Sequence, residues 1–532
     1  MFKTISTLGL AAAVASSAMA AEQWQTSWYA APQPGWDAGF ALPTNMPPAL
    51  HDQTVREALR LSAGGRRVRV VLSNRYGTEP LVIGEARLAR AGAGAVDSAP
   101  LSFGGKRSVT VAPGRQAVSD ALDFSVQPLE RLSVSTYFPQ RTLPSTFHWG
   151  AQQTAYIATG NQTAARRLAR AEALHGRVFL SAVHVSGGEA ATHGGGGGGG
   201  GATEASGCGA AAGGGGSCAA EAVGGGGAAE TSGGGAAAGG GSCAAVGRGW
   251  AGGTVVALGD SITDGNGSTP DQDRRWPDYL ARLAAPRGMG VANAGISGAR
   301  MLGDRMGERA AARFEQDVLA QPGVDSVIVA LGINDIGWPA SAFAPHDPAM
   351  EADTLIAGYR KLIERARANK VRVIGATMAP FENALQGTPL SDHYSPAKDA
   401  VRRQVNDWIR SSGAFDAVVD FDAVLRDPAH PSRLLAAFDS GDHLHPGDAG
   451  YEAMAQAAYA ALERRRADQA ERRNPPASRR LMADYALRAN PPYGSSNRAM
   501  PRDMLMREAC EGWLAISALP APRAASASAS LR

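Results

Sequence analysis

The stretch from Thr254 to Gly265 reads TVVALGDSITDG, and in it a small, acidic, hydroxyl-bearing cluster directly follows a short apolar run. A run of this kind predicts a buried strand that ends near Gly259. The cluster itself has two interpretations. It is either an ordinary turn or a nucleophile at the carboxyl end of a parallel strand, where α/β proteins bind their ligands.

Apolar runs alternate with longer amphipathic patterns from residue 252 onward. The apolar runs are VVAL (255–258), GVANA (290–294), DSVIVAL (325–331), VRVIGATM (371–378) and DAVVDF (416–421). The amphipathic patterns cover 277–286, 353–369, 395–412 and 449–466. Near-continuous apolar strands separated by amphipathic helices indicate βαβ units and a parallel sheet with both faces covered.

Residues 22–186 have a different pattern, in which short alternating segments are separated by turn-type residues. These segments lie at 66–74, 80–89, 107–113, 131–138 and 177–185. Several short strands without helical patterns between them predict an all-β sandwich or jelly-roll domain. The early aromatic residues Trp24, Trp28, Tyr29 and Trp36 fit either a sugar-stacking platform or internal packing, and packing is the favoured interpretation.

Two further segments have compositions that do not predict a packed core. Residues 187–249 consist mostly of Gly, Ala and Ser and predict a flexible linker, whereas residues 467–532 are rich in Arg, Pro, Ser and Ala and predict a disordered tail. The only four cysteines, Cys208, Cys218, Cys243 and Cys510, lie in these two segments without CxxC spacing. A structural zinc site is therefore not expected.

The first twenty residues predict export. Residues 1–20 combine one early Lys, a short apolar stretch and the sequence Ala18-Met19-Ala20, which is the pattern of a secretory signal peptide. We therefore expect a periplasmic or extracellular protein without a stable membrane anchor. The formal net charge of +3 over 532 residues gives no indication of a nucleic-acid partner.

Four chemistry-bearing clusters occur in the second half of the chain, each beside a predicted strand or helix end. They are Ser261 in GDS, Gly298 in NAGISGARM, Asn334 in GIND, and Asp442 with His445 in DHLHP. A single parallel sheet would bring all four to its carboxyl edge. Acyl transfer needs such a set, namely a nucleophile, a base, a group that orients the base, and donors for an oxyanion.

This order of motifs resembles the SGNH (GDSL-type) serine esterases and lipases, over residues 252–464. The resemblance implies a flavodoxin-like α/β/α sandwich, with Ser261 as nucleophile and Asp442 and His445 as the rest of the triad. It also implies that Gly298 and Asn334 are donors of an oxyanion hole. The Gly298 N–H and the Asn334 carboxamide can supply these hydrogen bonds, and the backbone N–H of Ser261 can point into the same site. Residues 22–186 are similar to the additional β-domain of some secreted members, in QTVREALR, VRVVLSNRYGTEPL and HWGAQQTAYIATGN.

Individual residues around these motifs have competing interpretations. Asp260 and Asp264 are expected to stabilise the turn, and the resemblance implies that His443 is a bystander, because the family's DxxH pattern matches His445. The Asp/His-rich run 442–448 could bind a metal, but no further cluster with ligand spacing accompanies it. His148 and Gln153 are expected to face the active site if the β-domain lies beside it.

The sequence therefore predicts a secreted serine esterase that acts on a small-molecule or polysaccharide ester and needs no metal or organic cofactor. The acyl group is expected to be short, and acetyl groups on carbohydrate are one candidate. A lysophospholipase or lipase activity is the alternative within the same chemistry. The alternative from another class is a non-catalytic carbohydrate-binding protein with a relict hydrolase domain.

Overall fold

The computed structural model describes residues 22–36, 40, 42–91, 98–187 and 253–473. The predicted signal peptide, nearly all of the predicted linker and the four cysteines lie outside the described residues, as does the tail beyond residue 473. The described residues before position 188 and those from 253 onward belong to one compact unit. The change from β-rich to α/β structure falls between Ser186 and Thr254.

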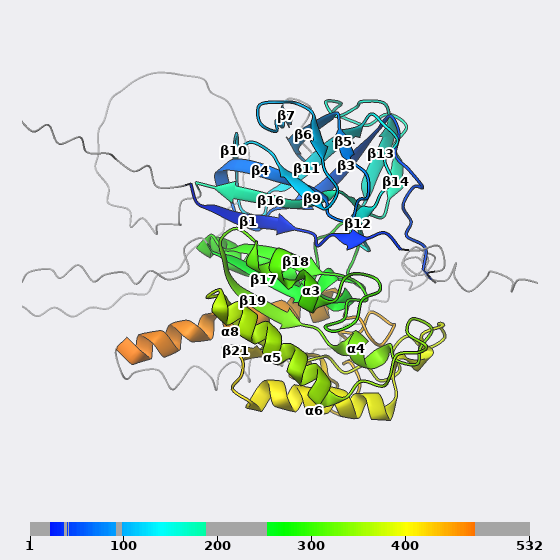
Figure 1. The fold of residues 1–532 in the computed structure, drawn as a ribbon. Helices are drawn as coiled ribbons and strands as arrows, with labels where there is room; N and C mark the ends of the chain where they lie inside the picture. The colour runs from blue at the N-terminus through cyan, green and yellow to red at the C-terminus, as the bar shows by residue number, and fades with distance from the viewer. Residues whose placement is uncertain (1–21, 37–39, 41, 92–97, 188–252, 474–532) are drawn as a thin grey trace, which may run out of the picture. The chain divides into compact units, whose positions relative to one another are not determined.

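Five parallel strands form the sheet of the α/β part, in the spatial order β18-β17-β19-β20-β21 (Figure 1). Their bounds are β17 Thr254–Gly259, β18 Gly290–Gly295, β19 Val324–Ala330, β20 Arg372–Ala376 and β21 Ala417–Val419. In chain order this arrangement is 2-1-3-4-5, the order of flavodoxin-like sheets. The expected fold class of the α/β part is confirmed.

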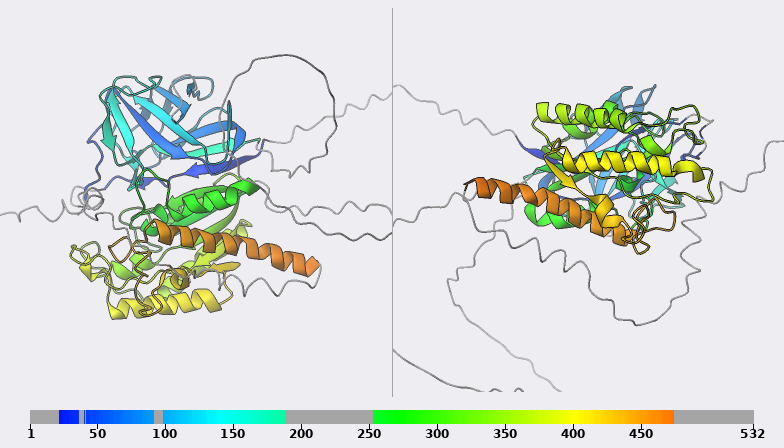
Figure 2. Two further views of the ribbon diagram at one scale, coloured as in Figure 1. Left: turned by 180° about the vertical axis from the view of Figure 1, so that it is seen from behind. Right: turned by 90° about the horizontal axis from the view of Figure 1, so that it is seen from below.

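Strand β17 is buried along its whole length because both faces of the sheet are covered. Val255 and Ala257 pack into a cluster with α2 and α8, and Val256 and Leu258 pack into the larger cluster on the opposite face. Helix α5 lies at the front in Figure 1, and α8 (orange) lies at the front in the view from behind in Figure 2. VVAL (255–258) does not alternate between polar and apolar residues, because its strand lies inside the sheet and both of its faces are buried.

The α-helices of this part are α1 Ser261–Asp264, α2 Trp276–Ala284, α3 Ala310–Phe314, α4 Ile333–Gly337, α5 Ala352–Ala368, α6 Pro396–Ser411, α7 Phe421–Leu425 and α8 Asp448–Arg473. Single turns η2 Ala285–Arg287 and η4 Ser391–His393 and the π-helix η3 Glu315–Leu319 accompany them. Helix α8 continues to Arg473, so the expected start of a disordered tail at residue 467 was wrong for its first residues. No helix of the described ranges is long and apolar enough to span a lipid bilayer.

Antiparallel strands make up the β-rich part, as expected. They are β1 Trp24–Tyr29, β2 Gln33–Pro34, β3 Gln53–Arg60, β4 Gly65–Asn74, β5 Leu81–Ile83, β6 Glu85–Arg90, β7 Ser98–Pro100, β8 Val109–Val111, β9 Arg115–Val118, β10 Leu122–Val126, β11 Arg131–Phe138, β12 Thr146–Trp149, β13 Ala155–Thr159, β14 Glu172–Leu174, β15 Gly176–Val178 and β16 Leu180–Ser186. Two predicted strands are each divided in two. Phe179, with φ of 62°, separates β15 from β16, and Gly84 separates β5 from β6.

The β-rich part lies along the edge strand of the parallel sheet, where β1 runs beside β18 (Figure 1). Ala30 forms a parallel bridge with Asn293, and the Val291 N–H donates to Ser62 Oγ at 2.8 Å. Trp28 and Tyr29 are both 5% exposed and belong to a hydrophobic cluster that extends into the α/β part. For these two residues, internal packing was therefore the correct interpretation.

Candidate active site

Ser261 is the first residue of helix α1, immediately after β17 ends. Asp260 caps this helix, because its Oδ1 accepts the N–H of Ile262 at 3.0 Å. The expected turn-stabilising role of Asp260 is thus visible in the structure. Burial raises the pKa of Asp260 to about 7. The tight strand-to-helix turn leaves the Ser261 hydroxyl at the carboxyl edge of the sheet.

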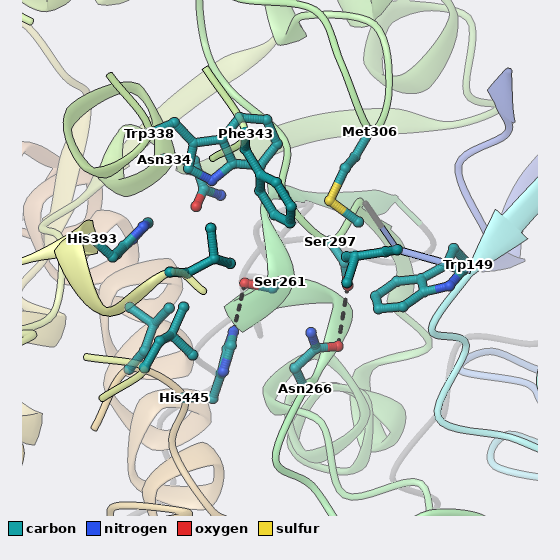
Figure 3. Close-up of a pocket in the computed structure, with 15 residues that line it drawn as sticks. Trp149, Ser261, Asn266, Ser297, Met306, Asn334, Trp338, Phe343, His393 and His445 are labelled. Atoms are coloured by element: carbon teal, nitrogen blue, oxygen red, sulfur yellow. Dashed lines mark hydrogen bonds between the residues drawn. The ribbon is translucent and has the colours of Figure 1, made fainter. Parts of the chain in front are cut away.

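Ser261, His445 and Asp442 form a continuous hydrogen-bonded chain. The Ser261 Oγ lies 2.8 Å from His445 Nε2 (Figure 3), and His445 Nδ1 lies 2.5 Å from Asp442 Oδ2. The carboxylate accepts from Nδ1, so Nε2 is the nitrogen that accepts the Ser261 proton. Asp442 Oδ1 also accepts the backbone N–H groups of Leu444 and His445, at 2.9 and 2.8 Å, which fixes the carboxylate on its own loop.

The pKa values of the two partners are displaced in opposite directions. Burial lowers the pKa of His445, but the neighbouring Asp442 carboxylate outweighs burial and raises that pKa above its ordinary value. Burial raises the pKa of Asp442, but His445 and the backbone donors outweigh it and hold that pKa well below its usual range. Asp442 is therefore an anion at neutral pH, as a group that orients and stabilises an imidazolium must be.

A second His–Asp pair lies on the same loop. His443 Nδ1 is 2.5 Å from Asp439 Oδ2, but the His443 side chain is 45% exposed and does not line the cleft described below. His443 has a positive φ of 62°, a backbone conformation that is uncommon for residues other than glycine. The interpretation of His443 as a bystander agrees with this placement.

Gly298 and Asn334 line the same cleft as Ser261. Gly298 has φ of +73°, and a Cβ at this position would lie 2.3 Å from Met306 Sδ, so only glycine fits. The Asn334 Nδ2 donates one hydrogen to the Ala299 carbonyl at 3.1 Å. Because an amide nitrogen carries two hydrogens, a second donor remains for a ligand.

Asp335, the next residue of the GIND motif, binds the backbone of the segment that follows Gly298. Its carboxylate accepts the N–H groups of Met301 and Leu302 at 2.6 and 2.9 Å. Burial raises the pKa of Asp335 to about 6. The sequence analysis singled out Asn334 and not Asp335, although both side chains bind the segment 299–302.

A cleft of about 380 Å³, including space open to solvent, contains these groups (Figure 3). Its walls are mostly apolar and aromatic, and two of the side chains come from the β-rich part. The lining residues besides Ser261, Gly298, Asn334 and His445 are Leu42, Trp149, Asn266, Ser297, Met306, Trp338, Phe343, Leu385, Leu390, His393 and Leu444.

Several lining residues carried no recognisable signal in the sequence. His393 is 1% exposed, and neither of its ring nitrogens has a hydrogen-bond partner among the described residues. Burial lowers its pKa to about 3, so it is neutral at pH 7. Trp149 stands within HWGAQQTAYIATGN, the segment that resembles the additional β-domain of secreted family members. His148 is absent from the lining, and Gln153 donates to Asp273 at 2.7 Å.

The described residues contain no group of three or more His, Cys, Asp or Glu side chains arranged to hold a metal ion. The cleft contains the Ser261 hydroxyl, which is bonded to an imidazole that is itself bonded to a carboxylate, and it is also lined by Gly298 and Asn334. Such a set can transfer a proton from Ser261 and stabilise negative charge on an oxygen bound in the cleft.

Solved structures with detectable likeness cover the α/β part. An acetyl xylan esterase from Geobacillus stearothermophilus is 26% identical over 40% of this chain and 95% of its own, with a TM-score of 0.31. A GDSL-like lipase from Bacteroides thetaiotaomicron is 19% identical over 40% of this chain and 88% of its own, with a TM-score of 0.30. Both TM-scores are low, so neither likeness bears on the activity. No curated protein sequence matches the chain.

One family model matches the chain, over residues 257–453, and it describes the GDSL-like Lipase/Acylhydrolase family. The matched range contains all five residues that the motifs singled out, from Ser261 to His445. It begins inside β17 and ends within α8, so it contains the other four strands of the parallel sheet in full. Residues 257–453 are therefore a GDSL-like lipase/acylhydrolase domain.

Proposed function

We propose that the protein is a serine esterase that hydrolyses carboxylic esters of short acyl groups. The observation that carries the proposal is the chain of contacts from Ser261 Oγ to His445 Nε2 (2.8 Å) and from His445 Nδ1 to Asp442 Oδ2 (2.5 Å). The match of residues 257–453 to the acylhydrolase family model is consistent with this chemistry but does not specify the ester.

In the proposed mechanism, Ser261 Oγ attacks the ester carbonyl while His445 Nε2 takes the hydroxyl proton. The resulting imidazolium is stabilised by Asp442. The carbonyl oxygen becomes an oxyanion, which accepts hydrogen bonds from the Ser261 N–H, the Gly298 N–H and the Asn334 side chain. His445 then gives its proton to the leaving alcohol, and an acyl-enzyme on Ser261 remains.

Deacylation repeats the same steps with water as the nucleophile. His445 takes a proton from the water molecule, the hydroxide oxygen attacks the acyl carbon, and the same donors hold the second oxyanion. Collapse of this intermediate releases the carboxylic acid and returns the proton to Ser261. All of these steps use groups of this chain alone.

The lining of the cleft supports a short acyl group. Bulky apolar side chains such as Phe343, Leu385 and Leu390 line the space beside Ser261, which favours a small acyl group over a long chain. The aromatic surfaces of Trp149, Trp338 and Phe343 can stack on a sugar or aryl ring of the alcohol. We therefore give priority to acetylated carbohydrates and aryl acetates over long-chain lipid esters.

The test compares the purified protein with Ser261→Ala on p-nitrophenyl acetate. We expect the variant to lose at least about 10⁴-fold in kcat, because the acyl-enzyme cannot form. Ser326→Ala is a matched control, since Ser326 is fully buried in the neighbouring strand and its hydroxyl has no partner among the described residues. Equal background rates in the wild type and Ser261→Ala would instead favour the carbohydrate-binding alternative.

The substrate class is tested on the active protein with p-nitrophenyl esters of increasing acyl length and with acetylated xylan. We expect kcat/KM to be highest for acetyl and to fall as the acyl chain lengthens, because the cleft has little room for a longer chain. A maximum at long acyl chains would replace this proposal with the lipase alternative.

We also propose that the protein is exported, because residues 1–20 have the composition of a signal peptide. Expression with a C-terminal tag, followed by N-terminal sequencing of the extracellular and periplasmic fractions, tests this. A mature chain that starts near Ala21 supports the proposal, and an intact Met1 in the cytoplasmic fraction alone contradicts it.

A further inference from the structure

His148, on strand β12 of the β-rich part, reaches the wall of the active site without lining the cleft. The residue is 4% exposed. Its Nδ1 lies 2.8 Å from the Ala31 carbonyl, and its Nε2 lies 2.9 Å from Oδ1 of Asp264. Asp264 closes helix α1, three residues after Ser261.

Both ring nitrogens of His148 face acceptors. A carbonyl oxygen can only accept, so Nδ1 donates to Ala31, and the Asp264 carboxylate accepts from Nε2. The contact between His148 and Asp264 is buried, with side chains 5% and 1% exposed. Buried contacts of this kind hold their partners in one orientation, because separating them leaves a buried polar group without its partner.

The second oxygen of Asp264 extends this contact to the oxyanion side of the cleft. Asp264 Oδ2 accepts from the Ser297 N–H at 3.0 Å and from Ser297 Oγ at 2.7 Å. Ser297 supplies the carbonyl half of the peptide bond whose N–H belongs to Gly298. Fixing Ser297 therefore fixes the direction of the Gly298 N–H.

A second set of contacts from the β-rich part reaches Met306, which lies beside Gly298. The Gln33 side chain accepts the Trp149 N–H and donates to the Met306 carbonyl, each at 2.7 Å. Trp36 Nε1 donates to the same carbonyl at 2.9 Å. Met306 is the residue whose sulfur packs against the Cα of Gly298.

We infer that His148 is a positioning residue of the active site, which acts through Asp264 and Ser297 to orient the Gly298 N–H toward the oxyanion. The inference rests on the proposed esterase function and deepens it, because it makes the β-rich part a structural component of the oxyanion hole. A misplacement of about 1 Å in such a donor typically costs about 10²-fold in rate.

The experiment measures kcat and KM for p-nitrophenyl acetate in the full chain carrying His148→Phe or His148→Gln. His148→Phe removes the donor to Asp264, and we expect kcat to fall by about 10- to 100-fold with KM within about threefold of wild type. His148→Gln retains an N–H that can reach a carboxylate, and we expect it to recover much of the lost kcat.

His184→Gln is the matched control. His184 lies in the same β-rich part and is 6% exposed, but its ring nitrogen accepts from Arg69 and the residue does not line the cleft. We expect its kcat to remain within about twofold of wild type. A comparable loss in His184→Gln would show that any buried histidine change acts through general destabilisation, and would overturn the inference.

A double-mutant cycle with Ser297→Ala separates positioning from simple packing. If His148 acts through Ser297, the losses in kcat of His148→Phe and Ser297→Ala are strongly non-additive. Additive losses overturn the inference. If His148→Phe does not fold, as judged by circular dichroism, the cycle is run with His148→Asn, whose shorter side chain does not span the gap to Asp264.

The outcome is distinguishable from a failure of the proposed function. If Ser261→Ala is as active as wild type, the esterase mechanism itself fails. If Ser261→Ala is inactive while folded His148→Phe retains kcat within about twofold, the esterase proposal stands and the role of His148 is refuted.

Discussion

The two flanks of Ser261 are built in different ways. On the base flank, named for the proposed role of His445, His445 and Asp442 lie three residues apart, and one short loop supplies both side chains and the backbone donors that hold them. On the oxyanion flank, named for the proposed role of Gly298 and Asn334, these two residues come from separate loops, and residues of the β-rich part hold that side through Asp264 and Met306. The first flank is local in sequence, whereas the second exists only after distant segments have packed together.

The loop before α8 shows that a local motif alone is not a catalytic site. His445–Asp442 and His443–Asp439 have the same 2.5 Å contact. Only His445 is buried and lies within hydrogen-bond distance of Ser261. The difference between the two pairs is therefore their position relative to the nucleophile and not the strength of the pair.

The largest expected effect concerns the base flank. Asp442→Asn retains the shape of the side chain but removes the negative charge that keeps the proton on His445 Nδ1, and we expect kcat to fall by about 10⁴-fold. Asp439→Asn makes the same change in the neighbouring pair and should alter kcat by less than about threefold. If both variants lose activity equally, the contrast between the two pairs is wrong.

The next effect concerns the oxyanion flank. Asn334→Ala removes a side-chain donor from the cleft, and we expect a loss of about 10²–10³-fold in kcat with little change in KM. Asn369→Ala, at the end of α5 and outside the cleft lining, provides the comparison for loss of an asparagine in general. A loss confined to KM would mean that Asn334 binds the ground state and does not stabilise the transition state.

A smaller effect is expected from Gly298→Ala. The new methyl group would lie 2.3 Å from Met306 Sδ and 2.8 Å from Trp338, so the loop must move and the donor with it. We expect at least a tenfold fall in kcat, of the order set by small misplacements of a catalytic group. Gly413→Ala has a similar positive φ of +65° with no atom near the new methyl group, and it should retain full activity. If Gly413→Ala also loses activity, backbone strain explains the loss in Gly298→Ala, and contact with Met306 does not.

The last prediction concerns the pH dependence of kcat/KM, for which the change expected at neutral pH is the smallest. His445 must be neutral to accept a proton, and Asp442 raises its pKa above the ordinary value of 6.5. We therefore expect kcat/KM to rise about tenfold per pH unit on the acid side and to level off only above pH 6.5. His443→Gln should leave this midpoint unchanged. A midpoint below 6.5 in the wild type would contradict the assigned influence of Asp442.

The sequence predicted the base flank and much of the sheet because both depend on local patterns. DxxH spacing places Asp442 and His445 on one loop, and unbroken apolar runs such as VVAL indicate strands covered on both faces. The support from His148 and Gln33 was not predictable in this way, since apolar periodicity does not specify which polar side chains meet across packed parts. His393 carried no signal for a similar reason, because an isolated histidine does not reveal whether it will be buried beside a cleft.

The bridge between Ala30 and Asn293 has a further consequence for solubility. Strand β18 ends the parallel sheet, and the β-rich part occupies its outer side with a backbone bridge and the Ser62 hydroxyl. Uncovered strand edges recruit other chains and promote aggregation. We therefore expect a truncated chain without the β-rich part to expose the β18 edge and to form intermolecular β-structure.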